Sequence, residues 1–452
     1  MCDQQEITAC STSLGEHALI AQELNPQGYL NIFHFLSQRT SMRKPEQAQV
    51  SRSPRDRQDK THASPPPYTY RPLEDEGDIR VLELRPNKSR IEIHIVHVAV
   101  SSKSYQALSY VWGEPDQSYR AFVLDKHSSA ISSLLLTKNL HDALCDLRDT
   151  KDMKNRTFWI DQISINQHDD HEKGLQVSMM SKIYTQAQRV ITYLGTEESP
   201  EQQRKGMRLL EKIYKNIPEN AWNHMYKADS IPQCKSGPLD GRIGLKPIQP
   251  DICVDFTSAS PIERQLFDLG WNWLVGVAYG EWAQRLWIVQ EQILNQDVMI
   301  LRGRQLIEWD AIAIIPILFA IGYIPHLYLR TIKRIAGADQ FDRYTYGSIE
   351  RSMYDMWWER RARSTGRPYY RETLFYNIHQ YAGLFCGNPL DQVYGILAIS
   401  RDAHDLALTP NYGCAFKELI KEVSIRTLKL ASDLMLLGYA STWQRPDSTL
   451  PS

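Results

Sequence analysis

An α/β fold with a parallel sheet at its centre is predicted for this chain of 452 residues. The main observation is a strand-helix-strand pattern over residues 157–194, where short apolar runs flank a stretch with helical periodicity. A second observation is that the apolar pattern becomes mainly helical from about residue 305. Hydrophobic residues make up 42% of the chain and charged residues 23%, as in ordinary globular domains.

The chain is expected to begin with a disordered polar segment, residues 1–66. Serine, proline and charged residues cluster in Ser51–Arg57 and Ser64–Pro67, which is typical of a linker. The N-terminus lacks both the basic and the apolar stretch of a secretory signal. The seven cysteines are odd in number and form no C-x-x-C pair, which indicates a reducing compartment. We therefore expect a cytoplasmic protein.

Ordered structure is expected from about residue 67, beginning with a β-hairpin. Ile79–Leu84 and Ile91–Val100 alternate between apolar and polar residues, and Pro86–Ser89 between them is typical of a turn. Ala107–Val111 reads as a short apolar strand, and Ala121–Leu124 as another.

A βαβ unit follows. Thr137 is placed to cap a helix, and Thr157–Ile160 then reads as a buried strand. The next helix begins at Asp169, with Glu172 completing a capping-box pattern, and Arg189–Leu194 is again a strand. This spacing predicts that residues 158–160 and 190–194 are parallel neighbours in one sheet, bridged by a helix over 170–188.

The predicted α/β core spans residues 67–304 and contains an insertion at about 196–270. Near its end, Glu281–Asn295 is expected to form one strong helix, and Val298–Leu301 a strand. Residues 305–452 are expected to be a mainly helical C-terminal region.

One apolar stretch, residues 311–329, approaches the length that spans a bilayer. Pro316, Pro325 and His326 interrupt it, so a buried core helix is favoured over a membrane-spanning one and no stable membrane insertion is expected.

Charge and motifs exclude several classes of function. The chain carries 52 basic and 53 acidic residues, a balance that gives no electrostatic attraction for nucleic acid. It contains no P-loop, no G-x-G-x-x-G and no G-x-S-x-G. The run His168–Glu172 straddles a helix start, where acids are favoured by the helix dipole, so we predict no metal site and no required cofactor.

Polar and aromatic residues at strand ends are the candidate binding residues. Asp161 follows a parallel strand, where ligand crevices of open α/β sheets lie; it either binds a polar partner such as a ribose hydroxyl or caps its own loop. Tyr110 and Trp112 flank the end of another strand and either stack on a nucleotide base or pack in the core, and core packing is favoured for Trp112.

Glu291 is the candidate catalytic residue. In a continuous helix its neighbours at three and four positions include Trp287 and Asn295, and none is basic. The carboxylate must therefore find a distant partner or shift its pKa, as a catalytic carboxylate does. The alternative is a structural ion pair with a distant arginine.

Three blocks of the sequence resemble one known family. They are Ala107–Gly113, then Trp159–Asp161 with Ile165–Gln167, then Trp287 with Gln290–Glu291. In this order they resemble the fungal heterokaryon-incompatibility (HET) domain. Further agreeing positions are Glu172, Lys173, Gln176, Val177, Met180, Ile183, Tyr184, Ala187, Val190, Leu194, Gly195, Arg285 and Gly303, with Pro389–Leu397 and Pro410–Tyr412 downstream. The resemblance covers roughly residues 68–425 and implies a role in non-self recognition and programmed cell death, as in innate immunity.

The sequence departs from that family at a few positions. Ser164 stands where the family usually has cysteine, which excludes a thiol mechanism there, and Tyr193 and Leu390 replace tryptophan and arginine. Family members commonly continue beyond the point equivalent to Ser452, so a truncated product is expected.

A weaker resemblance suggests chemistry. Ser109 and Tyr110, then Asp161, then Trp287 and Glu291 follow the order found in Toll/interleukin-receptor (TIR) domains. This resemblance implies a flavodoxin- or TIR-like core in which Glu291 cleaves NAD. Ser109, Tyr110, Trp112 and Asp161 would then hold NAD as substrate. Whether the chain is an enzyme stays open, because a non-enzymatic interaction module with an unknown protein partner, or a homo-oligomer, is the alternative.

Overall fold

The computed structural model describes residues 65–217, 261–320, 343–364 and 373–430, apart from Glu76, Lys88, Asp152 and Glu198. Most of the segment expected to be disordered, residues 1–64, lies outside the described residues, as do residues 218–260 within the expected insertion and residues 321–342.

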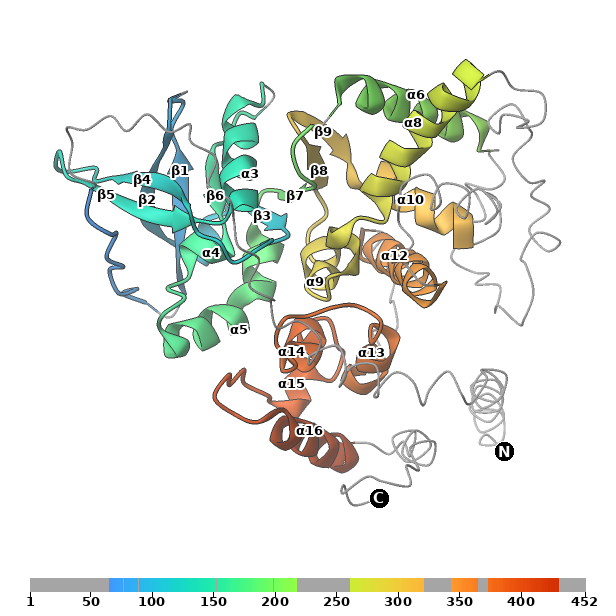
Figure 1. Ribbon diagram of the computed structural model, residues 1–452. Coiled ribbons are helices and arrows are strands. Elements are labelled where there is room, and N and C mark those ends of the chain that lie inside the picture. Colours follow the sequence, from blue (N-terminus) through green and yellow to red (C-terminus); the bar gives the residue numbers. More distant parts are fainter. Residues whose placement is uncertain are drawn as a thin grey trace, which may run out of the picture.

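Strands of the described residues form one mixed sheet, in the order β5-β4-β2-β1-β6-β3-β7-β8-β9 (Figure 1). The strands are β1 Asp78–Leu84, β2 Ile91–Ala99, β3 Gln106–Tyr110, β4 Tyr119–Leu124, β5 Ile131–Leu136, β6 Thr157–Trp159, β7 Val190–Tyr193, β8 Val298–Arg302 and β9 Gln305–Glu308. The helices within the sheet region are η1 Val100–Ser102, α3 Lys138–Asp149, α4 Asp161–Ser164, α5 Asp170–Gln186, α6 Pro200–Asn216, α8 Pro261–Ala278, η3 Glu281–Gln284 and α9 Ile288–Ile293. The C-terminal helices are α10 Trp309–Ala320, α12 Arg343–Ser364, α13 Leu374–Gln380, α14 Asp391–Leu397, α15 Ala403–Leu406 and α16 Phe416–Leu430.

The centre of the sheet is parallel, as predicted. Strand β3 pairs in parallel with β6 on one side and with β7 on the other, and β7 pairs in parallel with β8. Numbered along the chain, these four strands lie in the order 2-1-3-4, which is the order of flavodoxin-like sheets. The predicted α/β class with an N-terminal hairpin and a helical C-terminal region is confirmed.

The predicted pairing of β6 with β7 is wrong, because β3 lies between them. The chain leaves β3 in one direction to reach β6 and returns across β3 to reach β7. Right-handed crossovers that run in opposite directions place their helices on opposite faces of a sheet. Helix α3 indeed packs in one apolar cluster and α5 in another.

Alternation along the strands sorts the core into those two clusters. Successive strand residues face opposite sides of a sheet. On β3, Ala107 belongs to the cluster that contains α5 and α9, whereas Leu108 belongs to the cluster that contains α3. On β7, Val190 and Ile191 divide in the same way. The sheet is therefore covered on both faces, as a parallel sheet requires.

Two strands escaped the sequence analysis, and both are at the edges of the sheet. Strand β5 pairs antiparallel with β4, and β9 pairs antiparallel with β8. The outer side of β5 is paired in turn with the proline-rich segment, because Pro67 bridges to Ser133 and the Ser133 amide donates to the Pro66 carbonyl at 2.9 Å. Since proline offers no backbone donor, this segment ends the sheet rather than extending it.

The helix expected over residues 281–295 is interrupted. Its first turn is the 3-10 helix η3, Arg285 is extended with φ −79° and ψ 136°, and only Ile288–Ile293 form α9. Arg285 is bridged to Phe385, and the Phe385 amide donates to the Gln284 carbonyl at 2.6 Å. Backbone pairing with a distant segment therefore replaces the helical hydrogen bonds at this point.

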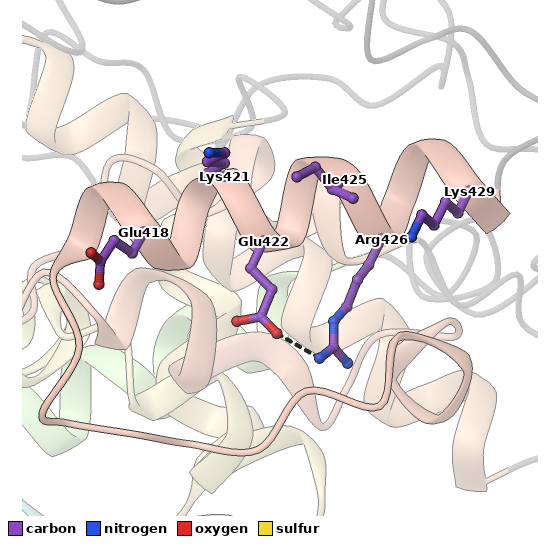
Figure 2. Close-up of a pocket in the computed structure, with 6 residues that line it drawn as sticks. All are labelled: Glu418, Lys421, Glu422, Ile425, Arg426 and Lys429. Carbon is purple, nitrogen blue, oxygen red and sulfur yellow. Dashed lines mark hydrogen bonds and ion pairs between the residues drawn. The ribbon is translucent and has the colours of Figure 1, made fainter.

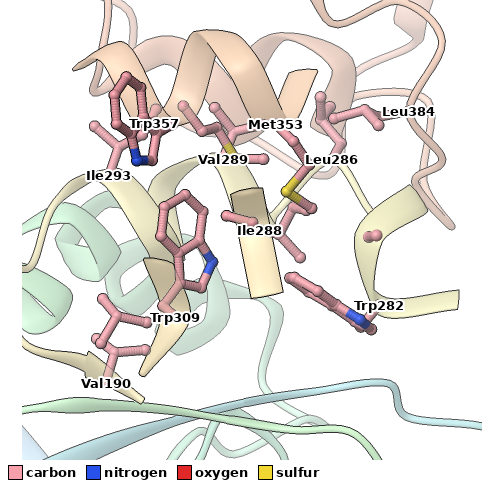
Figure 3. Packing of buried hydrophobic residues seen from close by; sticks show 14 of the residues in the cluster. Val190, Trp282, Leu286, Ile288, Val289, Ile293, Trp309, Met353, Trp357 and Leu384 are labelled. Carbon is pink, nitrogen blue, oxygen red and sulfur yellow. The ribbon is translucent and has the colours of Figure 1, made fainter. Parts of the chain in front are cut away.

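The apolar stretch beginning at residue 311 forms α10, which contains Pro316 and is buried from Ile312 to Phe319; residues 321–329 lie outside the described part. No helix within the described residues has the length and apolar character needed to cross a bilayer. Figure 3 shows Ile288, Val289 and Ile293 of α9 packed among Trp309, Met353 and Trp357. The C-terminal helices thus share one apolar core with the sheet.

Candidate functional site

Two candidate residues that are far apart in the sequence meet at the carboxyl end of the central strand. Ser109, on β3, donates its hydroxyl hydrogen to Oε2 of Glu291, on α9, across a separation of 182 positions. Both side chains are buried. In a 2-1-3-4 sheet the carboxyl ends of strands 1 and 3, here β3 and β7, flank the point where the strand order reverses, and ligands of open α/β sheets bind there.

Arg285 forms with Glu291 the ion pair that the sequence analysis gave as the alternative to a catalytic role, although it lies only six positions away and was not named as the partner. Its Nη2 lies 3.4 Å from Oε1 of Glu291. Burial lowers the pKa of the guanidinium, but the carboxylates of Glu291 and Asp161 more than offset this, so the pKa is raised overall. The expectation that no local basic residue could reach Glu291 is therefore wrong, because it assumed a continuous helix through Arg285.

Asp161 caps its own loop, which is one of the two roles that the sequence left open for it. Its Oδ1 accepts the backbone N–H of Gln162 at 2.7 Å, as a loop-capping carboxylate does, while its Oδ2 accepts the indole N–H of Trp112 at 2.7 Å. Burial raises the pKa of Asp161 to about 6, although the Trp112 hydrogen bond and the charge of Arg285 act in the opposite direction. The nearby charge of Glu291 raises this pKa further.

Two tyrosines add hydroxyl groups to the network. Tyr110 follows Ser109 on β3 and belongs to the α3 cluster, and its hydroxyl donates to Oε1 of Gln162 at 3.3 Å and also contacts Asp161. Tyr184, on α5, contacts Glu291 through its hydroxyl. Burial raises the pKa of both phenols, and the neighbouring carboxylates raise it further. Both hydroxyls therefore stay protonated and available as donors.

Trp112 does not pack in the core, which corrects the interpretation favoured from the sequence. Its side chain is 39% exposed and reaches Asp161 only through the indole N–H. Glycine follows it at a φ of +73°, a conformation that turns the chain sharply at the end of β3. An exposed aromatic ring is thus held at the rim of the polar network.

The side chains of this network differ in how far they are exposed to solvent. Glu291 is 2% exposed, whereas the side chain of Arg285 is 19% exposed. Nη1 of Arg285 is buried and finds no acceptor within the described part of the chain. The network therefore holds two carboxylates and one guanidinium, with a hydrogen-bond donor still unused beside Glu291. Two carboxyl groups in different environments are suited to acid–base or electrostatic chemistry.

Other residues close to the second sequence block serve the fold. Glu172 receives both terminal nitrogens of the buried Arg80, at 2.5 and 3.0 Å, and also accepts the Asn166 amide at 2.8 Å. The capping box expected at Asp169 is half formed, because Asp169 accepts the Glu172 amide at 3.0 Å while Glu172 itself turns to Arg80. Ser164 accepts the Ile160 amide at 3.1 Å and closes the short helix α4.

A signal for Arg285 was present in the sequence, since it is one of the further positions that agree with the family. Tyr184 was likewise among the agreeing positions. What the sequence did not show is that the chain is extended at Arg285, which turns its side chain toward Glu291 instead of along a helix.

Comparisons with known proteins point in one direction. Residues 105–291 match the model of the family described as Heterokaryon incompatibility protein (HET). A curated protein of Neurospora crassa, Heterokaryon incompatibility protein 6, OR allele, is 26% identical over 373 residues, which is 76% of this chain and 51% of the relative. The chain thus spans about half the length of the curated relative it matches. No solved structure matches it.

The family match begins at Tyr105, just before β3, and ends at Glu291 itself. It therefore includes the whole polar network of Ser109, Asp161, Arg285 and Glu291. The sheet order, the three sequence blocks and these matches agree that residues 105–291 are similar to the Heterokaryon incompatibility protein (HET) family.

Proposed function

We propose that this chain acts in heterokaryon incompatibility as an effector of programmed cell death, and that its polar network cleaves NAD at the bond between nicotinamide and ribose. The role in incompatibility is supported by the family match and by the named relative. The chemistry is supported by a resemblance to TIR domains, in which residues like Ser109, Asp161, Trp287 and Glu291 occur in the same order along the chain.

The observation that carries the chemical proposal is the hydrogen bond from Ser109 to Glu291 at the point where the strand order reverses. It brings the candidate catalytic carboxylate to the end of β3, beside Asp161. Trp112 adds an exposed aromatic ring at the rim, where a nicotinamide or adenine base can stack.

In the proposed reaction the bond between C1′ of the ribose and the nicotinamide nitrogen breaks. Its electron pair leaves with the nitrogen, which becomes neutral, and the ribose acquires oxocarbenium character. Glu291 stabilises this positive charge or holds the ribose hydroxyls. Water then adds to C1′ and releases one proton, which gives ADP-ribose and nicotinamide. The carboxyl of Asp161, with its pKa of about 6, is placed to accept that proton near neutral pH.

Arg285 has to move in this proposal. It is paired with Glu291 at 3.4 Å, and a cationic nicotinamide riboside cannot approach the carboxylate while the guanidinium holds that place. The phosphates of NAD are natural partners for a displaced arginine, because guanidinium binds phosphate oxygens in a bidentate manner. Binding of substrate and release of Glu291 would then be one event.

Replacement of Glu291 tests the chemistry. Glu291→Gln keeps the size of the side chain and its hydrogen bonding but removes the charge, and NAD turnover should fall by roughly 10²-fold or more. The matched control is Glu350→Gln, since Glu350 is also a buried glutamate and accepts the Tyr279 hydroxyl at 3.0 Å outside the network. Purified full-length variants would be assayed for nicotinamide release, and fungal cells expressing them for viability. Equal turnover in both variants and the wild type would refute the catalytic role.

A second candidate function is a non-enzymatic interaction module, and the surface of α16 favours it. Ile425, Leu428 and Leu430 are 42%, 44% and 48% exposed on this helix. Figure 2 shows Ile425 between the charged side chains of Lys421, Glu422 and Arg426, in a shallow groove along the helix. If this surface carries the function, Ile425→Asp with Leu428→Asp abolishes cell death, whereas Glu291→Gln leaves it unchanged.

A further inference from the structure

The part of the chain that bears Arg285 and Glu291 is held by a segment outside the family match. We call this segment, residues 385–412, the clasp segment. The Leu286 amide donates to the Phe385 carbonyl at 2.8 Å, next to the bridge between Arg285 and Phe385. Within α9, Nε2 of Gln290 donates to the carbonyls of Tyr394 and Gly395 at 3.1 and 2.7 Å.

Asp391 is the charged centre of the clasp segment. Its Oδ2 accepts the indole N–H of Trp287 at 3.1 Å, and its Oδ1 accepts the hydroxyl of Tyr412 at 2.7 Å. The side chain is 8% exposed, and burial raises its pKa against the lowering effect of the two hydrogen bonds and of Lys173. Lys173 reaches in from α5, with its ammonium 5.3 Å from the centre of the Tyr412 ring.

Trp287 transmits this contact to Glu291. It precedes α9 directly, and its carbonyl accepts the Glu291 amide at 3.2 Å, one helical turn later. Helix α9 has six residues, which is too short to hold its own conformation in water. Its rotation about its axis is therefore set by side chains that are fixed from outside. Successive residues of a helix differ by about 100° of rotation, so a small slip would carry the carboxylate away from Ser109.

We propose that Asp391 is a positioning residue for the polar network, because it fixes the Trp287 indole and thereby aims Glu291 at Ser109 and Arg285. Within the described part of the chain, Asp391 makes its hydrogen bonds with Trp287 and Tyr412 and not with Glu291 or Arg285, so it acts through Trp287. The functional unit then extends past residue 291 to Tyr412. The activity readout of this proposal rests on the proposed NAD cleavage, but its structural readouts do not.

The test compares Asp391→Ala, Asp391→Asn and a matched control in the full chain. The control is Asp146→Ala, because Asp146 is also 8% exposed and also accepts a tyrosine hydroxyl, that of Tyr193 at 2.9 Å, but on the α3 face of the sheet. Amide hydrogen exchange is followed for residues 284–293. The indole N–H resonance of Trp287 is assigned by its loss in Trp287→Phe.

We expect Asp391→Ala to speed exchange across 284–293 by roughly tenfold or more and to shift the Trp287 indole resonance. Asp391→Asn should restore part of both, since its amide oxygen still accepts one donor. Asp146→Ala should leave both readouts unchanged. Wild-type exchange and an unshifted indole resonance in Asp391→Ala would overturn the positioning role, whatever the activity.

Kinetics separate this proposal from the proposed function. If both hold, Asp391→Ala lowers kcat for NAD with little change in KM, and Asp391→Asn recovers part of kcat at an unchanged thermal midpoint. A wild-type chain that releases no nicotinamide would end the proposal of NAD cleavage. The exchange and indole results would still decide whether Asp391 positions the network.

Discussion

At the scale of single residues, Asp161 shows how a polar network can oppose folding. Its carboxyl receives two hydrogen bonds and lies near Arg285, yet burial and the neighbouring charge of Glu291 raise its pKa from 3.8 to about 6. The folded chain therefore binds this proton more tightly than the unfolded chain does. Stability from this group is present at low pH and is lost as pH rises through the interval between about 4 and 6.

This loss of stability with rising pH gives a prediction for Asp161→Asn. The amide does not titrate, so the free energy of unfolding of the variant should fall less steeply than that of the wild type between about pH 4 and pH 6.5. Urea denaturation at a series of pH values measures both slopes. Parallel curves for the two proteins would show that Asp161 titrates alike in the folded and unfolded chains.

The buried pair of Arg80 and Glu172 favours folding, because each charge would otherwise be buried without a partner. Arg80 is fully buried, and Glu172 binds it through both oxygens. Glu172→Gln leaves a buried positive charge without its partner and should lower the free energy of unfolding by about 3 kcal/mol. The control is Glu83→Gln in the exposed pair with Lys126, where the loss should stay below about 1 kcal/mol. Equal losses in urea denaturation would contradict this account.

Sequence reasoning at this scale succeeded where a strand end fixed the position. Ser109 and Asp161 lie at the ends of β3 and β6 as the apolar runs indicated. It failed for the partner of Glu291 and for Trp112. The two errors have different causes. A continuous helix was assumed around Glu291, although the chain is extended at Arg285. Trp112 was expected in the core because large aromatic residues are usually buried, although the chain turns at Gly113.

At the scale of elements, the close contact between α6 and α8 requires a residue without a side chain at position 206, where the chain has glycine. A Cβ added at Gly206 would lie 2.1 Å from Cε3 of Trp273, whereas one added at Gly276 would meet nothing within 4 Å. The two helices pack together, with Trp273 of α8 buried against α6. Glycine is otherwise unfavourable inside a helix, but at position 206 it leaves room for the Trp273 ring.

These two glycines give a paired prediction. Gly206→Ala overpacks the contact with Trp273 and should destabilise the protein by about 1–3 kcal/mol. Gly276→Ala, in the same helix pair, should stabilise it by about 0.5–1 kcal/mol, because alanine is the better helix former. Thermal unfolding of the two variants beside the wild type checks both signs, and a stabilised Gly206→Ala would show that Trp273 can move aside.

Periodicity identified most elements of the sheet region, including the hairpin, β3, β6, α5 and β7. It missed β5 and β9, which are short strands at the edges of the sheet. Edge strands are half-exposed and carry a weaker apolar pattern than central ones. The broken helix before β8 could not be predicted, because the interruption comes from pairing with Phe385, a residue 100 positions later in the chain.

At the scale of the whole molecule, one apolar cluster joins the sheet to the C-terminal helices. It contains Val190 of β7 and Ile300 of β8, but also Phe319 of α10 and Trp357 of α12. The parallel order of the sheet was accessible from the strand-helix-strand pattern. The position of β3 between β6 and β7 was not, since local sequence records neither the direction of a crossover nor the face it covers.

A fragment that ends at residue 304 should therefore not fold to a native core. It would expose the side of α9 and β8 that Phe319, Met353 and Trp357 cover. We expect such a fragment, residues 65–304, to bind hydrophobic dyes and to lack near-ultraviolet circular dichroism, in contrast to residues 65–430. A cooperative unfolding transition in the shorter fragment would show that the sheet region is independent of the helices.

The 182 positions between Ser109 and Glu291 also govern when the network can exist. A chain that leaves the ribosome presents β3 and Asp161 first, then Arg285 and Glu291, and Asp391 and Tyr412 last. The network therefore cannot form until its C-terminal residues have been synthesised. An unfinished chain has β3 and Asp161 but neither Glu291, the proposed catalytic carboxylate, nor Asp391, the proposed positioning residue. If the complete protein kills the cell that makes it, this order of assembly keeps each copy harmless until its synthesis has passed Tyr412.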